Sequence, residues 1–378
     1  MRVAHLHVLF EEAGGGEVLA LQMYRALTEL GHEVDLYTTH VDPHAWSVLS
    51  NNFRNEVPKP KVVRVAWVGV LRKVASGRAV RLRRVIAVKA LNSALRGMFR
   101  DYDVVIETQS NFPMNVSLSY IHFPAIYGYL EEKGSGPVWR AYNWAVRRLI
   151  KGALGTPRAV LTNSRWTADH VARAYGLSAE VLNPPIRYTE LAPLASGHRR
   201  SDVVLTVSRI SPEKHLEALP RIAKMVPQAD FYLVGSTSVY SAPVLDLIRR
   251  TAEEVGADNF HMVLNAPWEK LKGLYSEAKV YLHPPFAEHF GISVAEGSAS
   301  GALPVVFRDG GAWTDIVGPL LPWAGYEGLE EAARAVRKAL REWTPQLAAK
   351  VSRSMARFSY EEFRGRLGAK VKELAGRK

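Results

Sequence analysis

The sequence predicts an α/β protein with two parallel-sheet domains. The chain has 378 residues, more than one hydrophobic core usually organises, and 47% of them are hydrophobic. Short apolar runs typical of buried strands alternate with segments of helical periodicity in both halves. The alternation stops between Pro193 and Asp202, where small and polar residues indicate an interdomain linker. We therefore expect a first domain at residues 1–190, a second at 191–358, and a final helix at 359–378 that returns to the first domain.

The composition narrows the class of protein. The chain has no cysteine, which excludes disulfides and thiolate metal sites. It has no apolar run of about 18 residues, and acids stand where a signal peptide would have its cleavage region, so we expect a cytoplasmic protein. The formal charge of +12 predicts anionic partners. Nucleic acid, anionic lipid surfaces and phosphorylated substrates all satisfy that prediction.

We interpret the first half as a series of strands and helices. Predicted strands lie at residues 3–10, 33–39, 62–68, 103–108, 116–123, 159–164 and 180–182. A helix is predicted at 18–30, and Gly14, Gly15 and Gly16 precede it. Such a loop lets the backbone approach a phosphate closely, while a tight turn without a ligand explains the glycines equally well. The loop matches neither the GxGxxG nor the P-loop pattern, so dinucleotide and ATPase functions are not supported.

Three further features of the first half have two interpretations each. His122 stands at the carboxyl end of the strand predicted at 116–123, the edge where open α/β sheets bind ligands; a structural histidine is the alternative. Residues 72–100 contain nine Lys or Arg and no acid, which fits contact with an anionic membrane or a solvated basic helix face. Residues 127–151 are rich in Trp, Tyr and Arg, which suits an acceptor surface or a packed core.

The second half repeats the pattern and adds charged residues after its strands. Strands are predicted at 203–207, 231–235, 261–264, 280–282 and 302–307, and helices from residue 327 to the end, with a break at Pro345. Arg209 and Lys214 follow the first of these strands. Two cations at a strand end can converge on a diphosphate, Arg as a fork and Lys as a point charge. A solvated loop is the alternative.

The stretch from His283 to Gly301 carries the strongest functional signal. Glu288 lies in the loop before a helix predicted to begin near Gly291, and Glu296 lies inside that helix. The free N–H groups of a helix start attract anions, and carboxylates accept hydrogen bonds from hydroxyls. A nucleotide sugar has both phosphates and hydroxyls. The alternatives are a carboxylate stabilised by the helix dipole for Glu288 and a solvated helix residue for Glu296.

Together these residues resemble the retaining glycosyltransferases of family 4, which have the GT-B fold of two Rossmann-like domains facing a cleft. Glu288 and Glu296 match the E-x7-E motif of that family, and Arg209 and Lys214 are similar to its diphosphate-binding pair. Residues 14–16 resemble its N-terminal glycine loop, and the resemblance covers nearly the whole chain. Residues 120–124, 163–167 and 288–292 resemble, more narrowly, the α-1,2-mannosyltransferases of dolichol-linked oligosaccharide synthesis, which use GDP-mannose.

The resemblance implies transfer of a hexose, mannose from GDP-mannose, to a glycan or lipid-linked acceptor, with neither metal nor cofactor. Glu288 would contact the hydroxyls of the transferred sugar, Glu296 those of the ribose, and His122 would approach the sugar from the first domain. The implied catalytic residues are Glu288, His122, Arg209 and Lys214. The implied donor-binding residues are Gly15, Gly16, Arg209, Lys214, His289, Phe290, Gly291, Ile292 and Glu296. Peripheral contact with an anionic membrane is also implied.

Other functions remain open. Glucose or N-acetylglucosamine from a UDP-sugar would use the same residues. A sugar-nucleotide epimerase and a catalytically idle scaffold would share the fold. A basic nucleic-acid-binding protein would explain the charge, but the sequence lacks zinc-ligand spacing, aromatic RNA-binding motifs and a helix-turn-helix pattern.

Overall fold

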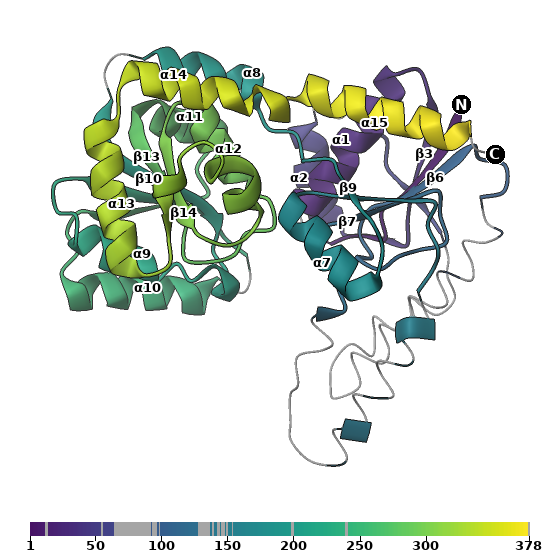
Figure 1. Ribbon diagram of the computed structural model, residues 1–378, viewed down its shortest axis with the longest axis horizontal. Helices are drawn as coiled ribbons and strands as arrows, with labels where there is room; N and C mark the ends of the chain where they lie inside the picture. Colours follow the sequence, from purple (N-terminus) through teal and green to yellow (C-terminus); the bar gives the residue numbers. More distant parts are fainter. Residues whose placement is uncertain are drawn as a thin grey trace. The chain divides into compact units, whose positions relative to one another are not determined.

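The computed structural model describes residues 1–11, 14–53, 56–63, 92, 97, 99–127, 137, 140–141, 144, 148, 150–152, 154–197, 200–238 and 241–376. The chain divides into two compact units (Figure 1). The first unit comprises Met1–Asn163, Thr167–Leu182 and Arg364–Lys378, and the second comprises Ser164–Trp166 and Asn183–Phe363. Each unit contains one large parallel sheet, so the predicted α/β class is confirmed.

The first unit is built on a seven-stranded parallel sheet of order β5-β3-β1-β6-β7-β8-β9. Its strands are β1 (Arg2–Leu6), β3 (Glu33–Thr38), β5 (Lys61–Val62), β6 (Val104–Glu107), β7 (Leu118–Ile121), β8 (Ala159–Thr162) and β9 (Glu180–Val181). The single strand predicted at 3–10 is wrong. The chain leaves the large sheet after Leu6, and β2 (Leu9–Phe10) pairs instead with β4 (His40–Val41) in a separate two-stranded sheet.

The helices of the first unit follow from their sequences. Helix α1 (Gly15–Glu29) buries Leu19, Met23 and Leu27 at helical spacing. Helix α2 (Pro43–Asn52) begins after Asp42, whose side chain accepts a hydrogen bond from the Ala45 backbone at 2.9 Å. Helix α7 (Arg165–Tyr175) follows β8, and its residues from Thr167 onward belong to this unit.

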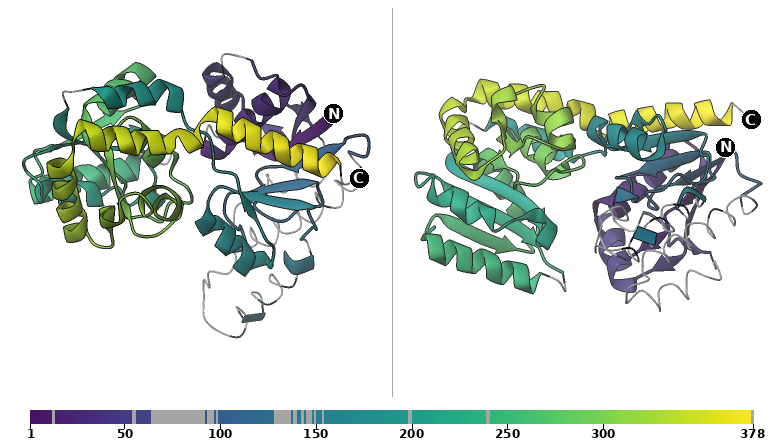
Figure 2. Two further views of the ribbon diagram at one scale, coloured as in Figure 1. Left: turned by 45° about the horizontal axis from the view of Figure 1, so that its top comes forward. Right: turned by 60° about the horizontal axis from the view of Figure 1, so that its bottom comes forward.

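The last helix, α15 (Tyr360–Ala375), belongs to the first unit from Arg364 onward (Figures 1 and 2). Arg364 Nη1 lies 2.9 Å from Glu29 Oε2 of α1, and Arg158 Nη2 donates to the Leu374 carbonyl at 2.6 Å. Lys370 pairs with Glu180 at the end of the sheet. The end of the chain therefore packs with the elements at its beginning.

The second unit is built on a six-stranded parallel sheet of order β12-β11-β10-β13-β14-β15. Its strands are β10 (Ser201–Arg209), β11 (Asp230–Ser236), β12 (Phe260–Leu264), β13 (Ala278–Leu282), β14 (Leu303–Phe307) and β15 (Gly325–Tyr326). The α-helices are α8 (Tyr188–Leu191), α9 (Ala218–Lys224), α10 (Ala242–Val255), α11 (Trp268–Glu277), α12 (Ile292–Ala299), α13 (Leu329–Glu342) and α14 (Pro345–Ser354). Helices α9, α10 and α13 pack together on one face, whereas α8, α12 and α14 lie on the other (Figure 1).

The predicted linker between Pro193 and Asp202 is wrong. Its described residues include a short 3-10 helix, Ala192–Ser196, that belongs to the second unit. Arg200 is buried there and donates to the carbonyl oxygens of Tyr275 and Leu194, each at 3.0 Å. The buried Arg200 guanidinium donates hydrogen bonds to backbone carbonyls and so fixes this segment to the core. The polar composition of the segment did not indicate this packing. Besides the short segment Ser164–Trp166, which belongs to the second unit, the chain passes between units at Leu182/Asn183 and at Phe363/Arg364, whereas the sequence suggested 190/191 and 358/359.

Strand order determines where a ligand can meet each sheet. In the second unit the order reverses between the neighbours β10 and β13, and in the first unit between β1 and β6. The connections leave such a pair of strands in opposite directions, which opens a crevice at their carboxyl ends. Lys214 and Glu288 follow one pair of strands, and His7 and Thr108 follow the other.

Candidate active site

The second unit brings Lys214 and Glu288 together at the carboxyl edge of its sheet. Lys214 ends a short 3-10 helix, Pro212–Lys214, after β10, and Glu288 lies in the loop between β13 and α12. Lys214 Nζ donates to Glu288 Oε2 at 2.6 Å and lies 4.4 Å from the centroid of the Phe286 ring. The two side chains are only 13% and 23% exposed, so water weakens their attraction less than at an open surface.

His283 completes a cluster around the Glu288 carboxylate. Its Nδ1 donates to the Pro284 carbonyl at 2.9 Å, because a carbonyl can only accept, and its Nε2 lies 3.6 Å from Glu288 Oε2. Burial by itself would raise the pKa of Glu288, but the contact with His283 and the charge of Lys214 outweigh burial and hold this pKa well below its usual range. Glu288 is therefore an ionised carboxylate at neutral pH.

Two glycines hold the Glu288 loop against the end of β14. Glu288 forms an isolated parallel bridge with Gly310, and Gly311 N donates to the Glu288 carbonyl at 2.7 Å. A Cβ on Gly310 would lie 2.4 Å from the Glu288 carbonyl oxygen, and one on Gly311 would lie 2.0 Å from that of His289. Only glycine permits this approach, which fixes the backbone that carries Glu288.

The predicted helix start after Glu288 is confirmed, but its side chains point in different directions. Gly291, with φ of 94°, precedes α12. Phe290 is buried against Phe358, so only its backbone is suited to a ligand. The His289 ring stacks on Trp166, with centroids 5.8 Å apart, and Ile292 packs against the hydrophobic core. Because these side chains have other contacts, the predicted donor binding at these positions would use the backbone amides.

Glu296 lies inside α12 and is half-buried. Its carboxylate accepts hydrogen bonds from the backbone N–H of Arg187 and, at 3.4 Å, from the Tyr275 hydroxyl. Burial raises its pKa, and these hydrogen bonds together with the Arg187 charge only partly offset that rise. Burial of this carboxylate destabilises its charged form, and a residue with that unfavourable effect on the fold suggests a role in binding a ligand.

We expect Glu296→Gln to raise the free energy of unfolding at pH 7 by roughly 0.5–2 kcal/mol and to weaken nucleotide binding. A carboxyl group whose pKa is higher in the folded state than in the unfolded state destabilises the fold at pH values above the unfolded-state pKa, which is near 4.5 for Glu296. The gain in stability from Glu296→Gln should therefore shrink as the pH falls toward 4. Urea unfolding at pH 7 and pH 4 measures this, with Glu277→Gln as a control outside the site. An equal gain at both pH values would contradict this explanation.

Arg209 is the last residue of β10, which ends two residues later than the strand predicted at 203–207. Its side chain is 54% exposed and pairs with Glu213 at 3.8 Å. The structure thus joins Lys214 directly to Glu288, whereas Arg209 stands at the same sheet edge with a different partner. The loop of Arg209 and Lys214 is not merely solvated, because Lys214 is mostly buried in its contact with Glu288.

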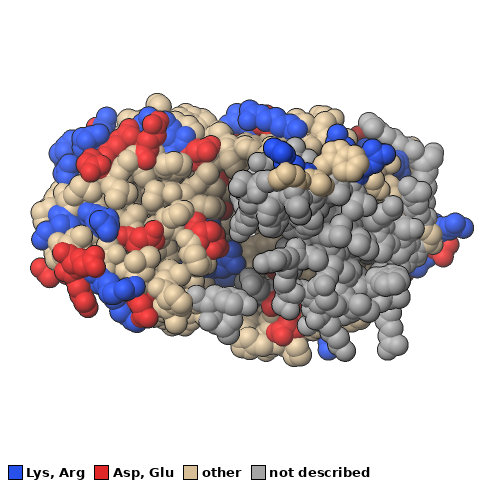
Figure 3. All heavy atoms as spheres, turned by 90° about the horizontal axis from the view of Figure 1, so that it is seen from below, with Lys and Arg blue, Asp and Glu red and all other residues tan. Residues whose placement is uncertain are grey.

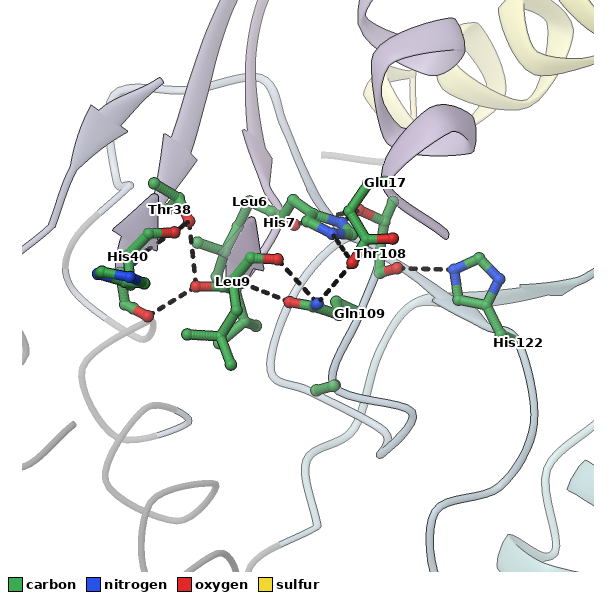
Figure 4. A network of polar contacts seen from close by, with 12 residues as sticks. Leu6, His7, Leu9, Glu17, Thr38, His40, Thr108, Gln109 and His122 are labelled. Atoms are coloured by element: carbon green, nitrogen blue, oxygen red, sulfur yellow. Dashed lines mark hydrogen bonds and ion pairs between the residues drawn. The ribbon is translucent and has the colours of Figure 1, made fainter. Parts of the chain in front are cut away.

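The first unit gathers the remaining predicted residues. A Cβ on Gly16 would lie 3.6 Å from His122 Nε2, and this nitrogen is 2.9 Å from the Thr108 carbonyl oxygen (Figure 4). The His122 backbone N–H donates to Asn111 Oδ1 at 2.7 Å. Gly15 is the first residue of α1. The glycine loop and His122 therefore lie side by side, and their contact with a donor stays a prediction.

Some predictions fall outside the described residues. These include most of the basic segment 72–100, most of 127–151 and the strand residues 64–68, and Glu12 and Ala13, which directly precede the glycine loop, are also not described. Over the described part of the chain, no group of three or more His, Cys, Asp or Glu side chains could hold a metal ion. The described helices also include none that is long and apolar enough to cross a membrane.

Charged side chains are mixed on the face of the second unit seen in Figure 3. Lys and Arg side chains lie among Asp and Glu there, at the left of the view. A nucleic-acid surface is instead typically a basic stripe or patch. This face gives no support to the nucleic-acid alternative.

The sequence interpretation missed His283 and Asp315. Asp315 is buried and accepts hydrogen bonds from the backbone N–H of Arg165 at 3.0 Å and from Asn183 Nδ2 at 3.3 Å. It thereby anchors two segments that adjoin the crossings between units. A histidine directly after a buried strand was a usable signal for His283. Nothing in the sequence around Asp315 indicates its distant partners.

Solved structures of other proteins identify the fold. Sucrose-phosphate synthase from Thermosynechococcus elongatus is similar over 100% of both chains, with a TM-score of 0.71 and 18% identity. HepE of Anabaena, solved with UDP-glucose, is similar over 99% of this chain and 100% of its own, with a TM-score of 0.68 and 14% identity. The protein has the GT-B fold of glycosyltransferases, as the resemblance implied.

The chain belongs to the family 4, or group 1, glycosyltransferases. The model of Glycosyltransferase Family 4 matches residues 13–188, and that of Glycosyl transferases group 1 matches residues 195–355. Together the two matches cover most of the chain, and the expected family is confirmed.

Curated relatives support the narrower resemblance. The human GDP-Man:Man(3)GlcNAc(2)-PP-Dol alpha-1,2-mannosyltransferase is 27% identical in an alignment of 251 residues that covers 60% of this chain and 50% of the human protein. The enzyme of the same name from Neurospora crassa is 26% identical in an alignment of 300 residues that covers 65% of this chain and 54% of its own. The matched part thus spans about half the length of these relatives.

Proposed function

We propose that this protein is a retaining glycosyltransferase that moves mannose from GDP-mannose to a lipid-diphosphate-linked glycan. The observation that carries the proposal is the 2.6 Å pair of Lys214 and Glu288, which places a cation and a carboxylate together at the carboxyl edge of a doubly wound sheet. The cation suits a diphosphate and the carboxylate suits sugar hydroxyls. Family membership and the names of the curated relatives support transfer of mannose.

The chemistry we propose is a front-side substitution at the anomeric carbon. The bond from this carbon to the diphosphate oxygen breaks, and a bond to the acceptor oxygen forms on the same face. The acceptor hydroxyl gives its proton to the departing diphosphate. Negative charge grows on the diphosphate while the bond breaks, so a fixed cation aimed at it lowers the barrier. Lys214 and Arg209 fill this role in the proposal, and neither a metal nor another cofactor is required.

The carboxylates have separate roles in the proposed complex. Glu288 orients the transferred sugar by accepting hydrogen bonds from its hydroxyls, and Glu296 accepts those of the ribose. The Lys214 ammonium has three hydrogens, so it can keep its bond to Glu288 while donating to a phosphate oxygen. In the proposed complex the same ion pair can therefore hold both the transferred sugar and the diphosphate of the donor. We further propose that the protein meets its lipid-linked acceptor on the cytoplasmic face of a membrane.

GDP and GDP-mannose are expected to raise the melting temperature of the protein, because a ligand that binds only the folded state stabilises it. Thermal unfolding with GDP, UDP, GDP-mannose, UDP-glucose and UDP-N-acetylglucosamine measures the preference. A larger shift with the UDP compounds would favour transfer of glucose or N-acetylglucosamine from a UDP-sugar over transfer of mannose. If none of the nucleotides shifted the transition, a glycosyltransferase function would be untenable.

A further inference from the structure

A buried set of polar contacts in the first unit ends at Glu17, near the start of α1 (Figure 4). His5 Nε2 and His7 Nδ1 lie 3.1 and 3.0 Å from Thr108 Oγ1, and both rings are fully buried. The second nitrogen of His7, Nε2, lies 3.9 Å from Glu17 Oε1. These contacts join the carboxyl ends of β1 and β6, where the order of this sheet reverses.

The Thr108 hydroxyl limits the directions that these hydrogen bonds can take. It has one hydrogen, which it can donate to the Leu6 carbonyl at 3.4 Å or to His7 Nδ1 at 3.0 Å, and the shorter contact favours His7. Burial, with a smaller effect of the neighbouring His7, lowers the pKa of His5 to about 3, so the His5 ring is neutral. The consistent arrangement has His5 donating to Thr108 and Thr108 donating to His7. His7 then carries its own hydrogen on Nε2 and directs it toward Glu17.

The opposite arrangement, in which His7 Nδ1 donates to Thr108, is unfavourable. His7 Nε2 would then carry no hydrogen, and its lone pair would face the negatively charged Glu17 carboxylate. The 3.9 Å separation exceeds a hydrogen bond, and His7 Nε2 has no hydrogen-bond partner in the described structure. His7 therefore attracts the Glu17 carboxylate without taking up its hydrogen-bonding capacity.

The surroundings of Glu17 hold its carboxylate in place. Gln109 Nε2 lies 3.5 Å from Glu17 Oε1 and also donates to the Leu9 carbonyl at 2.8 Å. A Cβ on Gly14 would lie 2.9 Å from Glu17 Oε2, so the glycine leaves room for the carboxylate to fold back over the helix start. The turn that carries Gln109 is itself fixed, because the Glu107 carboxylate accepts the Gln109 backbone N–H at 2.7 Å.

The chemistry around Glu17 selects a hydroxyl as its ligand. The Glu17 side chain is 13% exposed, and the described residues give it no Lys or Arg partner. A carboxylate repels a phosphate, and the described part of the chain holds no group of three or more ligands around a cation. A sugar hydroxyl, in contrast, donates a hydrogen bond to a carboxylate oxygen.

We propose that Glu17 binds a hydroxyl of the acceptor sugar and that His7 is the positioning residue behind it. This inference rests on the proposed function and assigns the acceptor side of the reaction to named groups. Glu17 touches the substrate, whereas His7 acts only through Glu17.

The test compares Glu17→Gln with Glu29→Gln, which removes a carboxylate from the other end of the same helix. The acceptor probe is Man(3)GlcNAc(2) diphosphate on a short isoprenoid chain, with GDP-mannose as donor. We expect Glu17→Gln to raise KM for the acceptor about tenfold or more, because a hydrogen bond to a charged group is lost. GDP should bind this variant as it binds wild type, and Glu29→Gln should have wild-type kinetics.

Acceptors that lack one hydroxyl each make the test specific. The deoxy acceptor that loses most affinity for wild type should lose no more for Glu17→Gln, because both changes remove the same hydrogen bond. His7→Gln keeps an N–H donor near the position of Nε2 and should stay close to wild type in acceptor KM, whereas His7→Leu should resemble Glu17→Gln. The difference in acceptor KM between the two His7 variants distinguishes a positioning role of His7 from a purely structural one.

The outcomes are distinct. If wild type transfers no sugar from any nucleotide sugar, the proposed function and this inference both fail. If wild type and Glu17→Gln transfer with the same acceptor KM, only the role of Glu17 fails. Loss of GDP binding in Glu17→Gln would likewise overturn the acceptor role, since it would assign Glu17 to the donor or to the fold.

Discussion

Lys214→Ala is expected to lower kcat by about two to three orders of magnitude, the usual effect of removing one group that stabilises charge in a transition state. Lys214 is the buried cation of the site, held at 2.6 Å from Glu288. Arg209→Ala should lower kcat in the same direction, and by less because its guanidinium is 54% exposed. Initial rates of mannose transfer at saturating donor measure both effects, and GDP binding should weaken in both variants.

Lys279→Ala is the matched control for Lys214. Lys279 also pairs with a carboxylate, with its Nζ 2.7 Å from Asp202 Oδ1, but it lies near the amino end of β13, away from the candidate site. We expect wild-type kcat from this control and a cooperative unfolding transition from every variant. Near-normal transfer in both Lys214→Ala and Arg209→Ala would exclude the diphosphate role of these cations.

Glu288→Gln should lower transfer by about two orders of magnitude while binding GDP at least as tightly as wild type. The loss follows because the transferred sugar is no longer oriented by an ionised carboxylate. The unchanged or tighter GDP binding follows because Lys214 no longer divides its charge between Glu288 and the diphosphate. Transfer rates and calorimetric titration with GDP measure the two quantities separately.

Glu327→Gln is the control for Glu288, since Glu327 is an exposed carboxylate paired with Arg308 at 3.2 Å. It should leave both measurements unchanged. A Glu288→Gln variant that transfers mannose normally would remove Glu288 from the chemistry. A variant that cannot bind GDP would show instead that Glu288 organises the donor site as a whole.

Much of the fold could be predicted because burial acts on local sequence. Apolar runs such as the one before His283 can only be buried, and the predicted strands of the second unit all appear, within a few residues of their expected bounds. The break of the first strand after Leu6 could not be predicted, because it depends on pairing between β2 and β4, which are far apart in the chain. The burial of Arg200 could not be predicted either, because the residues next to an arginine in the sequence do not distinguish a buried arginine from an exposed one.

The candidate site was predictable where its spacing is local. Glu288 and Glu296 lie on one loop and one helix, so their separation is set by eight residues of chain. The roles of their neighbours were not visible. Phe290 was expected near the donor and is a core residue, and His283 was overlooked although it contacts the Glu288 carboxylate.

By itself, the sequence determined the alternation of strands and helices, the motif that contains Glu288 and Glu296, and the family. Only the tertiary structure decided the partners: Lys214 meets Glu288 across 74 residues, and His7 meets Thr108 across 101. The reason is the order of the parallel strands. β10 lies beside β13, and β1 beside β6, so side chains from distant loops converge at the same edge of each sheet. Strand order is a property of the packed sheet, and no local pattern in the chain specifies it.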